Sequence, residues 1–347
     1  MHRTTRSTFA VLSLVLALVA GACGGGDDDS SERTTTTPAP TTTVAPPPAA
    51  PLTGLPVSDP GAAARPALVV KIDNVEPKAR PQAGINQADV VYEERVEGSV
   101  TRLFTVFHST DVGPVGPVRS ARTSDIPLVS QLNRPFFAWS GANIPFTQRI
   151  RAANLEDVGV DRATGEYERD RGRPAPSNLM LRSTAAIRSR ESSGGPPAPI
   201  FTYRAAGQQP AHLEAVAAVQ VSYGSLAGSA PVDYRWNGEG WARSQKGTPH
   251  VDSAGVQVAP PNVIIQFVNY VGSDIVDQFG KPIPEAQTVG EGEVWVLTAG
   301  GLVRGTWRKP SLEAVTTYTD VDGNPIGLTP GRTWVALPMP GGATVTG

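Results

Sequence analysis

The sequence predicts an α+β fold, in which an N-terminal mixed α/β domain is followed by a mostly antiparallel, β-rich C-terminal domain. Two features of composition lead to this prediction: glycine (Gly 36) and proline (Pro 33) are abundant, and only 18% of the residues are charged, which disfavours a helical bundle. In addition, short apolar runs rich in β-branched residues recur along the chain, whereas helical spacing is found only between residues 125 and 190.

The N-terminal segment, residues 1–22, has the layout of a secretory signal peptide. Two arginines precede an apolar run, Phe9–Ala20, and small residues follow it. This run is shorter than the about 20 apolar residues that span a bilayer, so a cleaved signal is favoured over a permanent anchor.

Cys23 is the only cysteine, so an exported chain has no intramolecular disulfide to form. The residues before it resemble a bacterial lipobox, in which the cysteine becomes the lipidated first residue of the mature protein, although Ala20 stands where Leu or Val is more common. We therefore expect lipidation at Cys23 and an extracytoplasmic protein anchored to the outer face of the bacterial cytoplasmic membrane. The alternative is a chance cysteine in the signal tail.

Residues 23–50 contain the lipidated cysteine and then a stretch rich in Thr and Pro with almost no large apolar side chain. Such a segment cannot offset the entropy of ordering, so it is predicted to be a disordered tether that spaces the folded part from its anchor. O-glycosylation of the threonine cluster is an alternative use of the same composition.

The N-terminal domain is predicted over residues 51–191. Strands are expected in "ALVVKID", "ADVVYEERV" and "VTRLFTVFHS", because these runs are apolar, β-branched or partly alternating. Apolar residues near helical spacing predict helices over residues 125–132, 144–154 and 178–190, the last with Asn178 as its capping residue.

A Gly/Pro-rich stretch, "SSGGPPAP", opens an interdomain linker predicted over residues 192–212. The C-terminal domain, residues 213–340, is expected to be built from hairpins, because Gly, Asn or Asp separate its apolar runs, as in "WNGEGW" and "DVDGNP". Its predicted strands cover residues 218–223, 232–236, 240–244, 262–270, 293–297, 302–307, 314–319 and 333–337.

The chain resembles the YerB-type lipoproteins, a bacterial family of unknown function, over nearly all of its folded length. In the first domain the resemblance is carried by "VVKIDN", "ARPQAGINQADVVYEERVEGSVTRL", "GPVGPVRSAR" and "RPAPSNL". In the second it is carried by "HVDSAGVQVAPPNVIIQ", "GEGEVWVLTAGGLVRGTW" and "YTDVDGNPIGLTPGRTWV". The resemblance implies a lipid-anchored, extracytoplasmic protein of two domains, and it implies no activity and no catalytic residues.

The stretch "GPVGPVRSARTSD" is the first candidate site. Residues three apart lie on opposite faces of a strand but on one face of a helix or turn, so Arg119 and Arg122 converge only if the chain turns there. The next residues favour a helix start, which with two guanidinium groups predicts an anion site. The alternative is that these arginines pair with Glu93, Glu94 or Glu97 and fasten the sheet.

Two further arginines belong to the candidate anion site. Arg102 lies on a neighbouring predicted strand, and Arg173 lies in the basic loop "RDRGRPAPSNL". Functional side chains often occupy loops that a rigid scaffold carries. If this loop folds against Arg119 and Arg122, several arginines line one cleft, and if it lies elsewhere it is solvated surface.

Asp73 and Glu94 are candidate acid/base residues, since a carboxylate pair is what cleavage of a glycosidic or phosphodiester bond often needs. Glu93 and Glu94 are neighbours on a strand, so they point to opposite faces and at most one of them enters a shared pocket. The alternative is structural, with Asp73 forming a turn at a strand end.

Several functional classes lack support in the sequence. The net charge of -2 offers no basic excess for nucleic acid, and no HExxH or CxxC motif supplies zinc ligands, so neither nucleic acid nor a metal or cofactor is expected. The favoured function is an envelope protein that binds a glycan, an anionic lipid or a protein partner. The alternative is an envelope hydrolase or transferase acting on a glycan or phosphodiester, and whether the chain is an enzyme stays open.

Overall fold

The computed structural model describes residues 48–224, 231–277 and 279–347, and Pro46–Gly347 form one compact unit. The predicted signal peptide, Cys23 and the tether up to residue 47 lie outside the described residues. Within the described part of the chain, no helix is both long and apolar enough to cross a bilayer.

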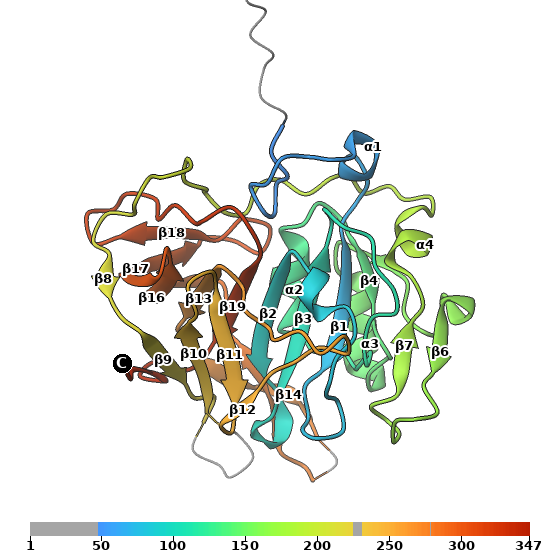
Figure 1. Cartoon of the computed structure of the whole chain (residues 1–347). Helices are drawn as coiled ribbons and strands as arrows, with labels where there is room; N and C mark the ends of the chain where they lie inside the picture. Colours follow the sequence, from blue (N-terminus) through green and yellow to red (C-terminus); the bar gives the residue numbers. More distant parts are fainter. Residues whose placement is uncertain (1–47, 225–230, 278) are drawn as a thin grey trace, which may run out of the picture. The chain divides into compact units, whose positions relative to one another are not determined.

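A mixed sheet of 11 strands forms the middle layer and draws on both halves of the chain (Figure 1). Its order is β18-β17-β16-β13-β19-β2-β3-β1-β4-β5, with β8 paired to β17 off this path. The N-terminal half supplies β1 (Leu68–Asp73), β2 (Val90–Arg95), β3 (Thr101–Phe107), β4 (Phe136–Ala138) and β5 (Glu156–Asp157). The C-terminal half supplies β8 (Glu214–Ala215), β13 (Asn262–Gln266), β16 (Gly290–Thr298), β17 (Gly301–Lys309), β18 (Thr317–Asp320) and β19 (Thr333–Leu337).

The strand β19 joins the two halves, because it pairs in parallel with β13 on one side and with β2 on the other. All five residues of β19 and all six of β1 are buried. Strands covered on both faces read as continuous apolar runs, which explains "LVV" and "WVAL" in these two segments. One hydrogen-bonded sheet therefore runs across the two regions that the sequence separates.

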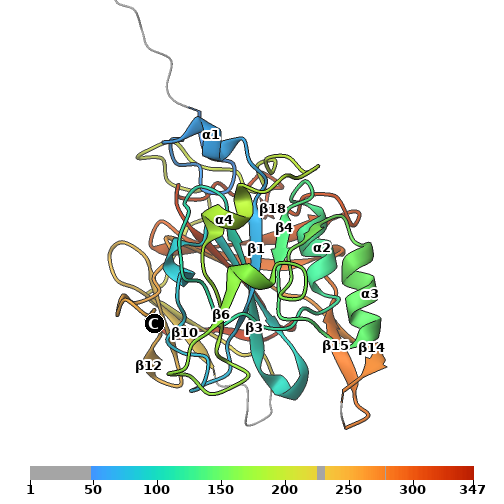
Figure 2. The same ribbon diagram turned by 90° about the vertical axis from the view of Figure 1, so that its right-hand side faces the viewer.

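Different layers cover the two faces of this sheet (Figure 2). On one face lies an antiparallel sheet with the order β12-β11-β10-β9-β20, and on the other lie the helices α2 and α3. The bounds are Ala218–Val221 (β9), Val232–Trp236 (β10), Trp241–Gln245 (β11), Thr248–Pro249 (β12), Ala343–Val345 (β20), Asp125–Ser130 (α2) and Ile144–Ala152 (α3). Two apolar clusters result, one that includes Trp241 and Trp334 and one that includes Phe104, Phe137 and Leu128.

The remaining elements lie at the edges. They are α1 (Pro60–Ala63), α4 (Thr184–Arg188), the pair β6 (Tyr167–Arg169) and β7 (Leu179–Leu181), and the hairpin of β14 (Tyr270–Val276) and β15 (Pro282–Ala286). The β14–β15 hairpin and the turn between β2 and β3 lie at the end of the molecule opposite to α1 (Figures 1 and 2).

The predicted α+β class is confirmed, with a mixed sheet in the N-terminal part and mostly antiparallel strands in the C-terminal part. The helix predicted over residues 178–190 is wrong in its first half. Leu179 and Leu181 are two residues apart, which is a strand period, and both are buried in β7. The shorter α4 begins after Ser183, whose side chain, rather than that of Asn178, caps it by accepting from the Ala186 N–H.

A second correction concerns the strand predicted over residues 262–270. β13 ends at Gln266, and Tyr270 begins β14, which belongs to a different sheet. The hairpin expected around "WNGEGW" is confirmed, since Trp236 and Trp241 face each other across β10 and β11.

Candidate functional site

An open cleft of about 750 Å³ lies beside the hairpin β14–β15. Four parts of the chain line it: the end of β2 with the turn that follows, the segment Arg119–Arg122, the start of α3, and the hairpin itself. The cleft therefore combines pieces that lie far apart in the sequence and contains both arginines of "GPVGPVRSARTSD".

Local backbone bonding explains how Arg119 and Arg122 reach the same cleft. The Arg119 N–H donates to the Lys71 carbonyl at 2.8 Å, which extends the edge of β1, and upstream Val115 and Leu181 exchange two backbone hydrogen bonds. The chain then turns, as the Asp125 N–H donates to the Arg122 carbonyl at 2.9 Å. The chain therefore makes the turn that allows Arg119 and Arg122 to converge.

Glu97 neutralises two of the candidate arginines. Arg122 donates to it through Nε at 2.9 Å and through Nη2, and Arg102 donates to it at 3.2 Å. Burial alone would raise the pKa of Glu97, but the hydrogen bond and charge of Arg122 and the charge of Arg102 lower it to about 2. Much of the donor capacity of Arg102 and Arg122 is thus already engaged inside the protein.

Arg119 is held differently. Its Nε donates to Asp73 at 3.2 Å, and Asp73 also accepts from the Ser177 hydroxyl at 2.7 Å. Its side chain is 24% exposed, and its two Nη atoms have no partner among the described residues. Asp73 is buried and lies outside the lining of the cleft, so it positions Arg119 rather than facing the open space.

Two cations of the cleft are absent from the sequence-based prediction. Arg95, at the end of β2, stacks on the Tyr270 ring at 5.4 Å, and Lys281 is exposed on the hairpin. Neither forms an ion pair with any described carboxylate, although Glu97 and Asp277 also line the cleft. No spacing in the sequence signals this pair, because only the docking of the hairpin brings Lys281 next to β2.

Arg173 lies away from the cleft lining. Its Nε donates to Asp170 at 3.0 Å, and its Nη atoms donate to the carbonyls of Ala79 and Pro81. The basic loop still lies near the cleft, because its Ser177 hydroxyl donates to Asp73, the carboxylate that pairs with Arg119. The structure therefore brings together Arg119, Arg122 and, through Glu97, Arg102, but not Arg173.

The start of α2 does not offer free backbone donors to an anion. The Asp125 carboxylate accepts from the Arg122 N–H at 2.7 Å, and the Ser124 hydroxyl accepts from the Ala286 N–H at 2.9 Å. The helix has only six residues. The N–H groups of Asp125 and Ile126 donate to the carbonyls of Arg122 and Thr123, so the anion site expected at a helix N-terminus stays a prediction that these contacts do not favour.

Glu94 also lies outside the cleft lining, in a closed cluster with Lys71 and Asp125. The Lys71 Nζ lies 2.5 Å from Glu94 Oε1 and 2.6 Å from Asp125 Oδ1, and all three side chains are fully buried. Burial raises the pKa of the Glu94 carboxyl to about 7, against the opposing charge of Lys71. Glu94 Oε2 has no hydrogen-bond partner among the described residues.

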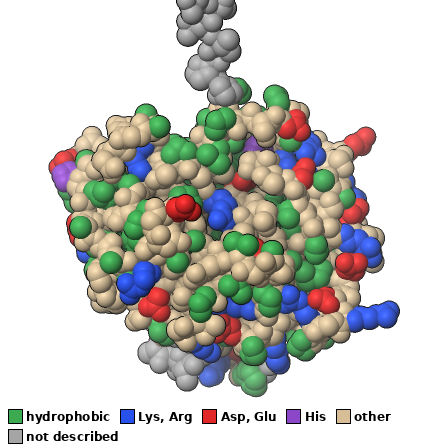
Figure 3. Space-filling view, viewed as in Figure 1, with side chains coloured by type: hydrophobic (Ala, Val, Ile, Leu, Met, Phe, Trp, Pro, Cys, Tyr) green, Lys and Arg blue, Asp and Glu red, His purple; other side chains and the backbone are tan. Residues whose placement is uncertain are grey.

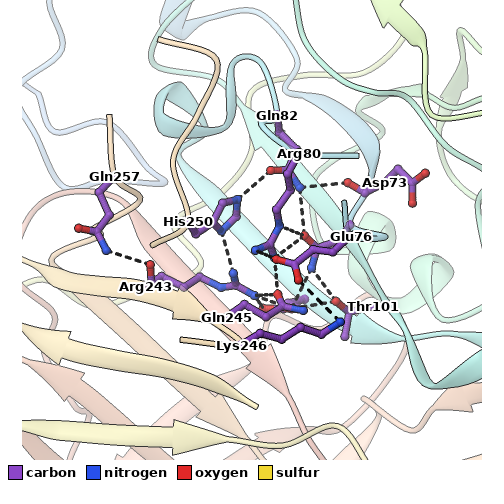
Figure 4. A network of polar contacts seen from close by, with 12 residues as sticks. Asp73, Glu76, Arg80, Gln82, Thr101, Arg243, Gln245, Lys246, His250 and Gln257 are labelled. Carbon is purple, nitrogen blue, oxygen red and sulfur yellow. Dashed lines mark hydrogen bonds and ion pairs between the residues drawn. The ribbon is translucent and has the colours of Figure 1, made fainter. Parts of the chain in front are cut away.

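Glu93, on the opposite face of β2, is bound by Arg243 and so belongs to a larger network that ties the two sheets together. Figure 4 shows the part of this network around Arg243, His250 and Gln82. Arg243 from β11 donates to both of its oxygens, at 2.9 and 3.0 Å. His250 accepts from Arg243 through Nδ1 at 2.7 Å and donates from Nε2 to Gln82 at 2.8 Å. Burial and the charge of Arg243 hold the pKa of His250 well below its ordinary value, so it is neutral.

The charged side chains on the visible face of the molecule do not form a field of one sign. Acidic and basic groups are interspersed on the face shown in Figure 3. The distinctive feature of the cleft is therefore local, namely cations without carboxylate partners next to apolar side chains.

Comparisons with known proteins place most of the described chain in one family. Residues 52–195 match the N-terminal domain, and residues 219–335 the C-terminal domain, of a protein family of unknown function, DUF3048. The chain is 28% identical over 299 residues to "Putative lipoprotein YerB" of Bacillus subtilis strain 168, a match that covers 83% of this chain and 85% of the relative.

The fold is also similar to a solved structure. The crystal structure of the YerB protein from Bacillus subtilis superposes with a TM-score of 0.73 at 25% identity, covering 86% of this chain and 100% of the solved one. The resemblance seen in the sequence motifs is confirmed by both comparisons. The chain belongs to the DUF3048 family and is similar to YerB over most of its length.

Proposed function

We propose that this protein is a lipid-anchored extracytoplasmic binding protein whose cleft takes an anionic glycan. The observation that carries the proposal is a set of three cations, Arg95, Arg119 and Lys281, that line the cleft with donors left over. Guanidinium and ammonium groups bind carboxylate and phosphate through charge-assisted hydrogen bonds. Such groups are the substituents that an anionic glycan carries.

Apolar side chains beside these cations support a polymer over a simple ion. Val276 and Phe279 are 51% and 77% exposed on the hairpin, next to Lys281. Exposed apolar side chains at the rim of a cleft are typical of ligand-binding grooves. Here they offer a surface for the nonpolar faces of sugar rings, while the cations hold the anionic substituents.

The length of the expected tether is compatible with a glycan ligand. The β14–β15 hairpin lies at the end of the molecule opposite to α1, close to which the described chain begins (Figure 1). A Pro-rich tether spans roughly 3 Å per residue when extended. An anchor at Cys23 followed by such a tether would allow the cleft to reach polymers of the cell envelope that lie away from the membrane.

The arrangement of carboxylates favours binding over hydrolysis. Asp73 and Glu94, the acid/base candidates, are buried and do not line the cleft. Glu97 does line it, but the low pKa of Glu97 keeps this group ionised and paired with Arg122. A general acid needs a proton to give near neutral pH, and Glu97 has none.

The proposal is tested by sedimentation of the chain from Gly24 to Gly347 with insoluble cell-wall material that retains its anionic polymers. We expect the protein to sediment with the wall. Lys281→Glu and Arg119→Gln should each weaken this binding by roughly tenfold, since a lost charge-assisted hydrogen bond costs about 1.5 kcal/mol or more. Arg308→Ala is the matched control, because Arg308 is an exposed cation outside the cleft.

Three outcomes would contradict the proposal. Equal binding by Lys281→Glu, Arg119→Gln and Arg308→Ala would remove the cleft as the site. Binding to phosphatidylglycerol vesicles without binding to the wall would identify a lipid ligand instead. Release of soluble sugar or phosphate from the wall would show an enzyme.

A further inference from the structure

The buried cluster of Lys71, Glu94 and Asp125 has a geometry that an ordinary ion pair does not require. Lys71 comes from β1, Glu94 from β2 and Asp125 from the first residue of α2. The lysine nitrogen lies 2.5 Å from one carboxylate and 2.6 Å from the other, and all three side chains have no exposed surface. An amine, a carboxyl to react with it and a second carboxyl within reach of the amine are thus held in contact.

Apolar side chains surround this cluster. Lys71 lies directly opposite Phe104 in the β1–β3 ladder, and Tyr92 lies opposite Phe104 on the other side. Leu128 and Val129 of α2 belong to the same buried core as these rings. In such a medium no bulk water solvates the amine or competes with it for the carboxyl.

We propose that Lys71 and Asp125 are joined by an intramolecular isopeptide bond, and that Glu94 is the catalytic residue that forms it. The Lys71 Nζ attacks Asp125 Cγ, so a C–N bond forms while the bond from Cγ to Oδ1 breaks. The products are one amide and one water molecule. The step is a condensation between groups of this chain, so it needs no oxidant, reductant or further reactant.

Glu94 transfers the protons that this condensation requires. As a carboxylate, Glu94 takes a proton from the Lys71 ammonium through Oε1 and leaves the amine nucleophilic. It then returns a proton to the departing oxygen of Asp125, a second proton from the amine completes the water, and Glu94 is regenerated. The raised pKa of Glu94 suits a group that must accept and release a proton near neutral pH.

Two further contacts suit this chemistry. The backbone N–H of Arg122 donates to Asp125 Oδ2 at 2.7 Å, so the oxygen that stays in the amide already has a donor for the charge that develops on it. Glu94 Oε2 is buried without any hydrogen-bond partner among the described residues. An unpartnered carboxyl oxygen in a core is costly in a purely structural cluster, but it is available to a group that passes a proton on.

Other charged pairs of the protein lack one element of this arrangement. The buried Arg243 with Glu93 has a guanidinium, which stays protonated and is not a nucleophile. The exposed Lys246 lies 3.9 Å from Glu76, and its side chain is 52% exposed. Water solvates that ammonium, so this pair serves as an internal control that should stay unlinked.

The bond would close a loop of chain between residues 54 positions apart. That loop contains the segment Arg119–Arg122, which forms one wall of the cleft. A covalent link of this kind restricts the unfolded chain as a disulfide does, and it needs no second cysteine in a chain that has only Cys23. The inference is independent of any ligand of the cleft.

The test is peptide mapping by mass spectrometry of the full-length chain purified from membranes. We expect a branched tryptic peptide that joins Lys71 to Asp125 and weighs one water molecule less than its two parts. Asp125→Asn is the sharpest variant, because an asparagine would lose ammonia and give a linked peptide of the same mass as the wild type. Lys71→Arg should give only unlinked peptides.

Glu94→Gln tests the catalytic role, and near-ultraviolet circular dichroism shows whether this variant keeps its tertiary packing. A packed Glu94→Gln chain with unlinked peptides supports the assignment, and one linked as fully as the wild type overturns it. If this variant does not fold, the wild-type map decides by itself. A wild-type chain with separate Lys71 and Asp125 peptides overturns the proposal. A Lys246–Glu76 link in the same map also overturns it, because the exposed control pair would then react as well.

Discussion

Two neighbouring glutamates on β2, which lie on opposite faces of the sheet, differ in their hydrogen-bond partners. Glu93 faces the small antiparallel sheet, where Arg243 donates to both of its oxygens. Glu94 faces α2, where Lys71 contacts one oxygen and the other has no partner among the described residues. Both are fully buried, so burial alone does not distinguish them.

The difference lies in hydrogen-bond satisfaction. Glu93 accepts further bonds from Asn74, Thr101 and Trp334, so each oxygen has at least two donors. A carboxylate whose oxygens are all engaged by donors, one of them a guanidinium, is a structural element. An unsaturated carboxylate beside a lysine and a second carboxyl is a reactive arrangement, because protons can move within it.

The largest effect is expected from Glu93→Ala. This change leaves Arg243 buried without its counter-charge, which costs about 3–5 kcal/mol of the free energy of unfolding. Urea unfolding of the purified chain measures the loss. Glu239→Ala is the control, because Glu239 is exposed and should change stability by less than about 0.5 kcal/mol. A loss no larger than that of the control would mean that Glu93 is not the anchor of this network.

The pH dependence of stability should reveal Glu94. The pKa of Glu94 in the folded chain is raised from 4.5 to about 7, so the folded state binds a proton more tightly than the unfolded state does. Its contribution is therefore complete below about pH 4.5 and is lost as the pH rises to about 7, an effect on the order of 3 kcal/mol.

Chemical unfolding of wild type and Glu94→Gln between pH 4.5 and 8 measures this slope. A covalent link would remove the charges of Lys71 and Asp125 that act on the Glu94 carboxyl, so the same slope is also measured in the Lys71→Arg chain, which cannot be linked. Parallel curves for the two chains would contradict the raised pKa.

Replacing both Glu93 and Arg243 by apolar residues should lower the free energy of unfolding by less than the sum of the two single replacements. Glu93→Leu together with Arg243→Met removes both charges at once, and residues in one ion pair show coupling energies of about 0.5–3 kcal/mol. A double-mutant cycle from urea unfolding yields the coupling. Strict additivity would show that the two side chains do not depend on each other.

The smallest effect is expected from Thr101→Val, which keeps the shape of the side chain but removes the hydroxyl that donates to Glu93 at 2.8 Å. The cost should be about 1–2 kcal/mol, because the bond is made to a charged group. Thr317→Val, at an exposed position on β18, is the matched control. The same loss from both variants would assign the effect to strand propensity rather than to Glu93.

Much of the fold follows from local patterns. The strands Val232–Trp236 and Thr333–Leu337 were predictable to the residue, because apolar and β-branched runs are bounded by Gly, Pro or Asn. Alternation also predicts that Glu93 and Glu94 point to opposite faces, which is confirmed by their partners. The region 178–190 failed because the spacing of two from Leu179 to Leu181, a strand period, was joined to the spacing of four from Leu181 to Ala185, a helical period.

The candidate site was predictable only in part. Arg119 and Arg122 follow from a spacing of three before a turn, and local bonding produces that turn. Arg95 and Lys281 could not be found in this way, since a hairpin from the other half of the chain supplies Lys281. Long-range contacts of this kind leave no periodic signal in a single sequence.

The sequence by itself determined the α+β class, most of the strand pattern and the absence of a second cysteine, and it predicts an export signal at the N-terminus. Only the tertiary structure decided which charges meet. In the folded chain Glu97 pairs with Arg102 and Arg122. Lys71 is buried between Glu94 and Asp125, and donors of Arg119 stay available in the cleft. The physical reason is that local patterns act over a few residues, whereas burial and pairing of charge depend on side chains that only folding brings together.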